Sequence, residues 1–416
     1  MARFRKRCDA LKWTLRDKGD QLRFPAVVER LLVGMGRHRA AAAALPIRRL
    51  YVDISVIARD DAGTGIQRVV RSVYARLGEV CADDVAIVPV VVKRRRDGYS
   101  TLDGEPLQGG PDAVFFGLDF STDSIFRYRK ELGRFRRSGG RLWFVLHDIL
   151  PLSHPHWFTA ASGLKYRRWL RVLAGVADGF LCVSSVVVGQ LAHLLQKRYG
   201  LASVPAIVEI PLGSSIVAAS QAVPPTSLSS LPGLSEEMLR RAALVVGTLE
   251  PRKGHVDVLD AFDLLWQSGS QIPLVLIGRR GWNTQALQHR IRDHSRAGTL
   301  LFWYDDIDDA TLYAAYARCR MAIVPSLAEG YGLPLDEALF LGAPVLARDI
   351  PVFRRHQQAA LAYFPVTACA QDLAAMIEDF HGKAQDLPSS QVSFVTWTET
   401  ALACLRAIGC ARAANP

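Results

Sequence analysis

Residues 322–347, AIVPSLAEGYGLPLDEALFLGAPVLA, decide the fold of this chain. Their pattern predicts an apolar strand, a Gly-rich turn, a helix, a second turn and a second strand. Gly330 and Gly332 allow the backbone to approach a ligand closely where the helix begins, and a helix N-terminus favours anions. Glu329 precedes the predicted helix and Glu337 lies inside it, so the two carboxylates do not form one adjacent acid/base pair. We expect them to contact different parts of one extended ligand with a central phosphate, such as a nucleotide sugar.

A second motif, ALVVGTLEPRKGH at residues 243–255, has the same strand-to-helix character. The predicted strand is followed by Arg252 and Lys253, which stand at the start of a helix that runs through Trp266. Two cations therefore lie beside another helix terminus that favours anions. This arrangement suits the phosphates of the same ligand.

The two motifs together resemble the signature of retaining GT-B glycosyltransferases of family 4, the glycosyl transferases group 1. That family carries two glutamates eight positions apart around Gly-aromatic-Gly-Leu-Pro, as Glu329 and Glu337 are here. Its Glu-Pro-Arg-Lys-Gly segment binds the donor pyrophosphate through a lysine, which Lys253 matches. Many members carry a further arginine where this chain has Thr248 or Leu249.

The resemblance implies a role for each matched residue. Glu329 is expected to bind hydroxyl groups of the donor sugar, and Glu337 to bind both ribose hydroxyls. Lys253 is expected to neutralise the diphosphate, and we count it with Glu329 among the catalytic residues. The other residues expected to contact the donor in this half of the chain are Arg252, Gly330, Tyr331, Gly332 and Leu333.

His147 is the third predicted catalytic residue. It follows an apolar strand predicted at residues 142–146 and is itself followed by Asp148. Family 4 enzymes often carry a histidine after this strand, which is thought to contact the donor sugar near the scissile bond. We assign no role to His154 or His156, because their spacing to His147 does not match a metal site.

Gly63, Thr64 and Gly65 lie at the first predicted strand-to-helix crossing, within DAGTGIQR at residues 61–68. Loops at the carboxyl ends of parallel strands bind ligands, so these residues are predicted to face the donor phosphates, with Arg68 behind them. The alternative is that they form only an N-terminal helix cap.

Length and composition favour two ordinary domains, because the chain has 416 residues and half of them are hydrophobic. The sequence has no run of about 18 apolar residues, so we expect no membrane-spanning helix. Its start lacks an apolar signal core, so we do not expect export. The seven cysteines are scattered without a CxxC pair. This pattern favours a reducing cytoplasm and disfavours zinc or a disulfide framework. We expect no cofactor and no metal.

Most of the net charge of +11 belongs to residues 1–49, where thirteen Lys and Arg stand against four acids, a net charge of +9. Apolar residues at helical spacing predict two helices in this segment. Residues 1–45 either bind an anionic membrane surface or form a solvated helix pair on the body. No nucleic-acid-binding motif follows, so nucleic acid is not an expected partner.

The predicted fold class is α/β, with two doubly wound parallel sheets of the GT-B kind facing a cleft. The expected division is a basic segment at 1–49, an acceptor-side domain at 50–215, a linker at 216–240, a nucleotide-sugar domain at 241–394, and a helix at 395–416 that crosses back to the first domain.

The predicted function is transfer of a hexosyl unit, with retention, from a nucleotide diphosphate sugar to a saccharide or lipid-linked saccharide. The segments TGIQR, HDILP and GTLEPRK resemble bacterial O-antigen or exopolysaccharide mannosyltransferases, so GDP-mannose is the first candidate donor. The expected location is the cytoplasm or the inner face of the cytoplasmic membrane. A sugar-nucleotide epimerase of GT-B fold and a non-catalytic basic scaffold that binds membrane or nucleic acid are the alternatives.

Overall fold

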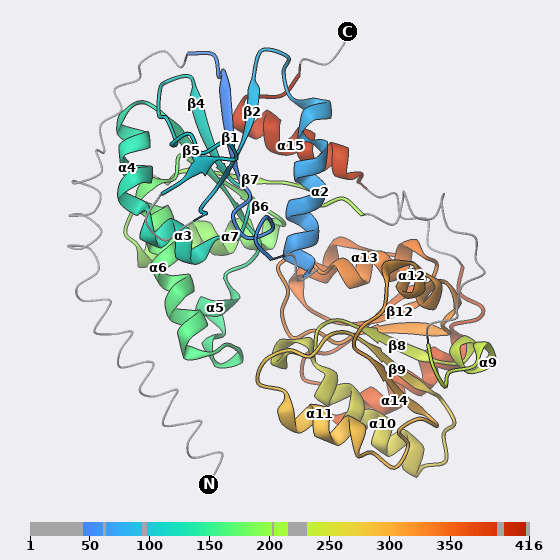
Figure 1. Cartoon of the computed structure of the whole chain (residues 1–416). Helices are drawn as coiled ribbons and strands as arrows, with labels where there is room; N and C mark the ends of the chain where they lie inside the picture. Colours follow the sequence, from blue (N-terminus) through green and yellow to red (C-terminus); the bar gives the residue numbers. More distant parts are fainter. Residues whose placement is uncertain are drawn as a thin grey trace. The chain divides into compact units, whose positions relative to one another are not determined.

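The computed structural model describes residues 45–60, 64–93, 98–201, 204–214, 231–388 and 395–412. The chain divides into two compact units (Figure 1). Unit 1 comprises residues 1–156, 160–213 and 397–416, and unit 2 comprises residues 157–159 and 214–396. The two N-terminal helices predicted within residues 1–44 lie outside the described residues, so they stay a prediction.

Unit 1 is built on a seven-stranded sheet with the order β3-β2-β1-β4-β5-β6-β7. Its strands pair in parallel except for the short β3, which is antiparallel to β2. Every residue of β4 and β6 is buried, which explains why these segments are continuous apolar runs. The strand bounds are β1 (Arg49–Asp53), β2 (Ala86–Val91), β3 (Ser100–Thr101), β4 (Ala113–Gly117), β5 (Arg141–Leu146), β6 (Gly179–Cys182) and β7 (Ala206–Glu209).

The helices of unit 1 form two groups (Figure 1). In one group α2 (Gly65–Val80) packs against α15 (Trp397–Ile408), so the end of the chain completes the first unit. The other group contains α3 (Thr122–Arg127), α4 (Arg129–Arg137) and α6 (Ala160–Val176). Because strand order reverses between β1 and β4, right-handed crossovers carry the helices before and after this point to opposite faces of the sheet. The remaining α-helices in the described part of unit 1 are α5 (Leu150–Ser153) and α7 (Ser185–His193).

Unit 2 has a six-stranded, wholly parallel sheet with the order β10-β9-β8-β11-β12-β13. Its strand order reverses between β8 and β11, the place where open parallel sheets bind ligands. The strands are β8 (Ala243–Val246), β9 (Leu274–Ile277), β10 (Leu301–Tyr304), β11 (Met321–Val324), β12 (Val345–Arg348) and β13 (Leu361–Phe364). The α-helices among the described residues of unit 2 are α9 (Glu236–Arg240), α10 (His255–Gln267), α11 (Gln285–Arg292), α12 (Asp309–Arg318), α13 (Leu333–Phe340) and α14 (Ala370–Lys383).

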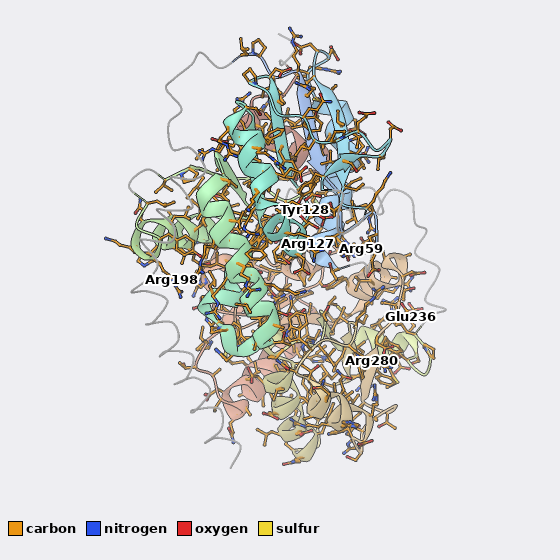
Figure 2. The ribbon with its side chains drawn as sticks, turned by 60° about the vertical axis from the view of Figure 1, so that its left-hand side comes forward. Arg59, Arg127, Tyr128, Arg198, Glu236 and Arg280 are labelled. Carbon is orange, nitrogen blue, oxygen red and sulfur yellow. The ribbon has the colours of Figure 1, made fainter. Side chains whose placement is uncertain are left out.

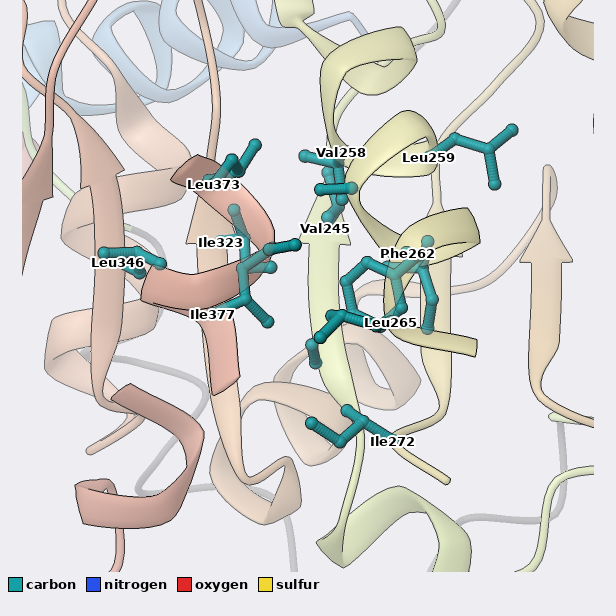
Figure 3. Close-up of a cluster of buried hydrophobic side chains, with 14 of the residues drawn as sticks. Val245, Val258, Leu259, Phe262, Leu265, Ile272, Ile323, Leu346, Leu373 and Ile377 are labelled. Atoms are coloured by element: carbon teal, nitrogen blue, oxygen red, sulfur yellow. The ribbon is translucent and has the colours of Figure 1, made fainter. Parts of the chain in front are cut away.

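A buried apolar cluster joins the sheet of unit 2 to α10 and α14 (Figure 3). Each large side chain buried there contributes roughly 1.5–3 kcal/mol relative to exposure. The cluster holds β8 and β11 side by side, and with them the loops that follow these strands. Its members include Val245, Val258, Phe262, Leu265, Ile323, Leu346, Leu373 and Ile377.

The predicted fold class is therefore confirmed, because both units are doubly wound parallel sheets covered by helices. Residues 236–240 of the predicted linker form α9, so the described part of that linker contains a short helix. Within the described ranges no helix is both long enough and apolar enough to cross a membrane.

Candidate functional site

The loop after β8 is shaped for close contact with the end of β11. Pro251–Lys253 forms one short 3-10 turn, and Gly254 has a positive φ of 70° before α10 begins. A Cβ on Gly254 would meet the carbonyl oxygen of Pro325 at 2.2 Å, so only glycine permits both the conformation and the approach. The Glu-Pro-Arg-Lys-Gly turn therefore lies against the beginning of the second loop.

The second loop connects β11 to α13. It ends at Gly332, whose φ of 94° lies in the left-handed region. A Cβ added at this position would lie 2.4 Å from the ring of Phe353. α13 begins directly after it, so the positive end of the helix dipole faces the Gly-Tyr-Gly turn. As predicted from the sequence, Glu329 precedes this helix and Glu337 lies within it, where it is buried with 6% of its surface exposed.

An ion-paired cluster joins the two loops. The Glu329 carboxylate accepts from Lys253 Nζ at 2.5 Å, from Arg252 Nη1 at 2.6 Å and from Ser326 Oγ at 2.8 Å. Arg252 also donates through Nε to Glu250 at 2.8 Å. Only 8–16% of the surface of the four charged side chains is exposed. Two cations and two carboxylates thus form a nearly enclosed, electrically balanced group.

Burial alone would raise the pKa of Glu329, but Arg252, Lys253 and the hydrogen bonds from Lys253 and Ser326 outweigh it and lower this pKa to about 2. The pKa of Glu250 is raised, because burial of that carboxyl outweighs its pairing with Arg252. Glu329 is consequently charged throughout the working pH range. The two cations are held in place by this carboxylate, an arrangement that suits an anion.

This pairing was not predicted from the sequence. There Glu329 is expected to bind the donor sugar and Lys253 to neutralise the diphosphate. The two residues are 76 positions apart, and no local pattern reports such a contact. The structure brings Arg252, Lys253, Glu329 and the N-terminus of α13 together. The sugar-binding role of Glu329 and the ribose-binding role of Glu337 stay predictions.

Arg355 supports the Gly-Tyr-Gly turn and was also missed. It donates to the Tyr331 carbonyl at 2.5 Å and to Asp336 Oδ1 at 2.6 Å, and its guanidinium lies 4.2 Å from the centroid of the Tyr331 ring. His356 Nε2 lies 2.8 Å from the same Asp336 oxygen. These contacts attach the turn to the first part of α13.

Arg348 supports the other end of the same loop. Its side chain is 2% exposed at the end of β12, and it donates to the Pro325 carbonyl at 2.9 Å and to Asp257 Oδ2 at 2.5 Å. Asp257 belongs to the first turn of α10, so Arg348 fastens the end of β11 to the helix that follows Lys253. An arginine at the end of an otherwise apolar strand is the sequence signal that could have identified this position.

In unit 1, His147 directly follows β5, as predicted. Its Nε2 is buried and has no hydrogen-bond partner among the described residues, and burial lowers its pKa to about 4. The imidazole is therefore neutral at pH 7. Asp148 has a structural use, because its carboxylate accepts from the backbone N–H of Leu150 at 3.0 Å.

Thr64 forms a capping box with Gln67 at the start of α2. Its hydroxyl oxygen accepts from the Gln67 backbone N–H at 3.3 Å, which is the alternative that the sequence left open. Gly65 is the first residue of this helix, and Gly63 lies outside the described residues. A phosphate-facing role for these three positions stays a prediction.

Comparison with known proteins finds a family match over the part of the chain that contains this cluster. The model of the family described as glycosyl transferases group 1 matches residues 235–381, which contain the whole ion-paired cluster. The chain carries a domain of this family. Across 377 aligned residues it is 34% identical to the serotype-specific mannosyltransferase WbdA of Escherichia coli, with 85% of this chain and 45% of that protein covered. Over 140 residues it is 32% identical to O-antigen chain mannosyltransferase B of Escherichia coli, with 33% of this chain and 36% of that protein covered.

The chain spans about half the length of the WbdA proteins that it matches. Among solved structures, it is similar to Anabaena HepE in complex with UDP and glucose, with a TM-score of 0.53, 16% identity and coverage of 88% of this chain and 96% of that one. It is also similar to sucrose-phosphate synthase of Thermosynechococcus elongatus, with a TM-score of 0.52, 15% identity and coverage of 87% and 98%. At these identities the likeness shows the GT-B fold alone.

Proposed function

We propose that this protein is a retaining glycosyltransferase that moves a hexosyl unit from a nucleotide diphosphate sugar to a saccharide or lipid-linked saccharide. The observation that carries the proposal is the cluster of Lys253, Arg252 and Glu329 beside the N-terminus of α13. It lies inside the domain that matches glycosyl transferases group 1. Mannosyltransferases among the relatives make GDP-mannose the first candidate donor and bacterial surface polysaccharide the expected product.

The proposed reaction breaks the bond between the anomeric carbon and the β-phosphate oxygen, and forms a bond from that carbon to an acceptor hydroxyl. The negative charge on the leaving diphosphate grows in the transition state, so fixed cations and a helix dipole around it lower the barrier. With retention, the leaving phosphate accepts the proton of the acceptor hydroxyl on the same face of the sugar. No protein base is then required.

The two cations are proposed to take the part that a divalent metal plays in other sugar transferases. Among the described residues, no group of three or more His, Cys, Asp and Glu side chains is placed to hold a metal ion. Because the two cations are placed to meet the charge of the diphosphate, transfer should survive chelation by EDTA. Loss of transfer with EDTA and its return with magnesium or manganese would contradict this part of the proposal.

A panel of nucleotide sugars tests the function directly. Thermal shift with GDP, UDP and dTDP sugars should identify a donor that stabilises the folded protein, since a ligand that binds only the folded state raises the melting temperature. The same donor should be hydrolysed slowly or transferred to a mannose-containing acceptor. Binding without turnover on any acceptor would favour a scaffold, and conversion of the sugar without transfer would favour an epimerase.

A further inference from the structure

The helices α3, α4 and α6 of unit 1 carry an unusual concentration of positive charge, and we call their outer surface the basic face. Together they contain ten Lys and Arg residues and two acids. Six of these cations are exposed: Arg127, Lys130, Arg134, Arg137, Lys165 and Arg168. Figure 2 brings this side forward, with Arg127 and Tyr128 labelled at the junction of α3 and α4.

The two acids do little to offset this charge. Asp123 is exposed and pairs with Lys165 at 2.7 Å. Glu131 points inward and accepts from the backbone N–H of Tyr99 at 3.2 Å. Asp123 is thus the one exposed acid on these three helices, all of whose residues are described.

Other helix surfaces of the chain differ. The α2 and α15 pair of unit 1 carries four arginines and two glutamates, and the α10 and α14 pair of unit 2 carries six acids and one lysine. Since the chain carries +11 and residues 1–49 carry +9, the remainder has a net charge of only +2. The basic face is therefore a local separation of charge, which the total for residues 50–416 conceals.

Apolar groups lie among these cations. Leu164 is 43% exposed on α6, one turn before Arg168. The guanidinium groups of Arg129 and Arg168 lie 4.7 Å and 5.4 Å from the centroid of the half-buried Phe126 ring. Cations with apolar stems beside an exposed leucine and a half-buried aromatic ring suit a surface that rests on lipid headgroups.

We infer that the basic face docks on an anionic lipid surface. Charge complementarity favours phosphate-bearing headgroups, and the two arginines over Phe126 cover the aromatic face on which an unpaired nucleobase would stack. The residues of this face belong neither to the segment 1–45 nor to the ion-paired cluster of unit 2. The inference rests on the proposed function only in taking a lipid surface as the partner, because an enzyme with a lipid-linked acceptor would meet that acceptor at a membrane.

The test compares two charge-matched variants of the full-length chain. R127Q/K130Q/R134Q/R168Q removes four cations of the basic face, and R240Q/R241Q/R292Q/K383Q removes four exposed cations of unit 2. Each is mixed with vesicles of phosphatidylcholine with or without about 30% phosphatidylglycerol, and bound protein is measured by flotation over a range of salt concentrations.

The wild type should bind the anionic vesicles more tightly at low salt than at high salt. Each cation near the surface strengthens binding about fivefold, so the basic-face variant should bind about 10²- to 10³-fold more weakly. The unit 2 variant should change far less. Equal losses in the two variants, or no vesicle binding by the wild type, would overturn the inference.

Two further measurements separate lipid binding from nucleic-acid binding and from a loss of folding. Binding of duplex DNA or RNA by the basic face, without vesicle binding, would replace lipid by nucleic acid and so refute the inference. Transfer to a water-soluble acceptor should be unchanged in both variants, which also shows that they fold. If this transfer is present while selective vesicle binding is absent, the inference about the basic face is wrong and the proposed function stands. If selective vesicle binding is present while transfer is absent, the inference stands and the proposed function is wrong.

Discussion

The two sheets reverse their strand order at equivalent places, but the side chains there are used differently. In unit 1 the reversal lies between β1 and β4, and Asp53 at the end of β1 is completely buried. Its carboxylate accepts from Ser55 Oγ and Ser121 Oγ, each at 2.5 Å, and from the Tyr99 hydroxyl at 3.2 Å. Nearby, Asp119 accepts from two backbone N–H groups of the loop after β1. At this place in unit 1 the carboxylates are therefore satisfied by the protein's own hydroxyl and backbone groups.

In unit 2 the reversal lies between β8 and β11, and one of the carboxylates there is Glu329, whose side chain is 8% exposed. Glu329 accepts from the Ser326 hydroxyl as well, but its charged partners are the long cationic side chains of Lys253 and Arg252. Such cations can form bonds to a ligand phosphate while they remain paired. The two units therefore share a topology at this place but differ in its side chains, and the cationic side chains of unit 2 are the ones that suit an anionic ligand.

The largest expected effect is on nucleotide affinity, and it applies to unit 2 alone. Glu337→Ala should remove two charge-assisted hydrogen bonds to a ribose, each of roughly 1.5–3 kcal/mol, so affinity should fall by about two orders of magnitude or more. Calorimetry with the free nucleoside diphosphate measures this, with Glu378→Ala on the exposed side of α14 as the control. Unchanged affinity in a folded Glu337→Ala protein would remove the ribose role.

The next effect is on the rate. Lys253→Ala should lower turnover by about 10²- to 10³-fold, and lower nucleotide affinity less, because the charge that this ammonium meets grows during the reaction. Lys383→Ala removes an exposed, ion-paired lysine of the same unit and should change neither property. Equal losses in turnover and affinity would show that Lys253 binds the ground state and the transition state alike.

Glu329→Gln should have a smaller effect, of about tenfold or somewhat more in turnover. The substitution keeps the size of the side chain but weakens its hold on Lys253 and Arg252, and it removes a charged acceptor for the sugar. Affinity for the bare nucleotide should not fall, because the cluster becomes more positive. Glu236→Gln, at an exposed ion pair, is the control. Normal turnover with poor nucleotide binding would mean that the roles of Glu329 and Glu337 are exchanged.

These comparisons also show what the sequence can predict. The strands, the Gly-containing turns, the positions of Glu329 and Glu337 and the helix at residues 397–408 follow from local patterns of apolar residues, Gly and Pro. Strand β3 has only two residues, too few to show a period, and β13 was also not predicted. The pairing of Glu329 with Lys253 and the support from Arg348 join distant parts of the chain, so they depend on the folded sheet. The hydrogen bonds around Asp53 in unit 1 were not predicted for the same reason, since Asp53 and Ser121 are 68 positions apart.

The last comparison concerns pH, where the two buried carboxylates should behave in opposite ways. Burial raises the pKa of Asp53 to about 6, because its hydrogen bonds from Ser121 and Ser55 offset only part of the desolvation and Asp119 adds repulsion. Below the ordinary value of 3.8 its contribution to stability is fully present, and this contribution is lost as the pH rises through 6. Glu329, with its pKa lowered from 4.5 to about 2, contributes stability above 4.5 that is lost as the pH falls toward 2.

Each group changes the free energy of unfolding by at most about 1.4 kcal/mol per pH unit, so variants must be compared in matched series. Hydrogen exchange of peptides from β1 and from β11, followed against urea at each pH, gives the stability of each unit separately. Asp53→Asn should abolish the fall in stability of unit 1 between about pH 4 and 6, and leave unit 2 unchanged. Glu329→Gln should abolish the rise in stability of unit 2 between about pH 2 and 4.5. If the stability of unit 1 in Asp53→Asn keeps the wild-type slope against pH, ionisation of Asp53 does not destabilise unit 1. The difference drawn between Asp53 and Glu329 would then be wrong.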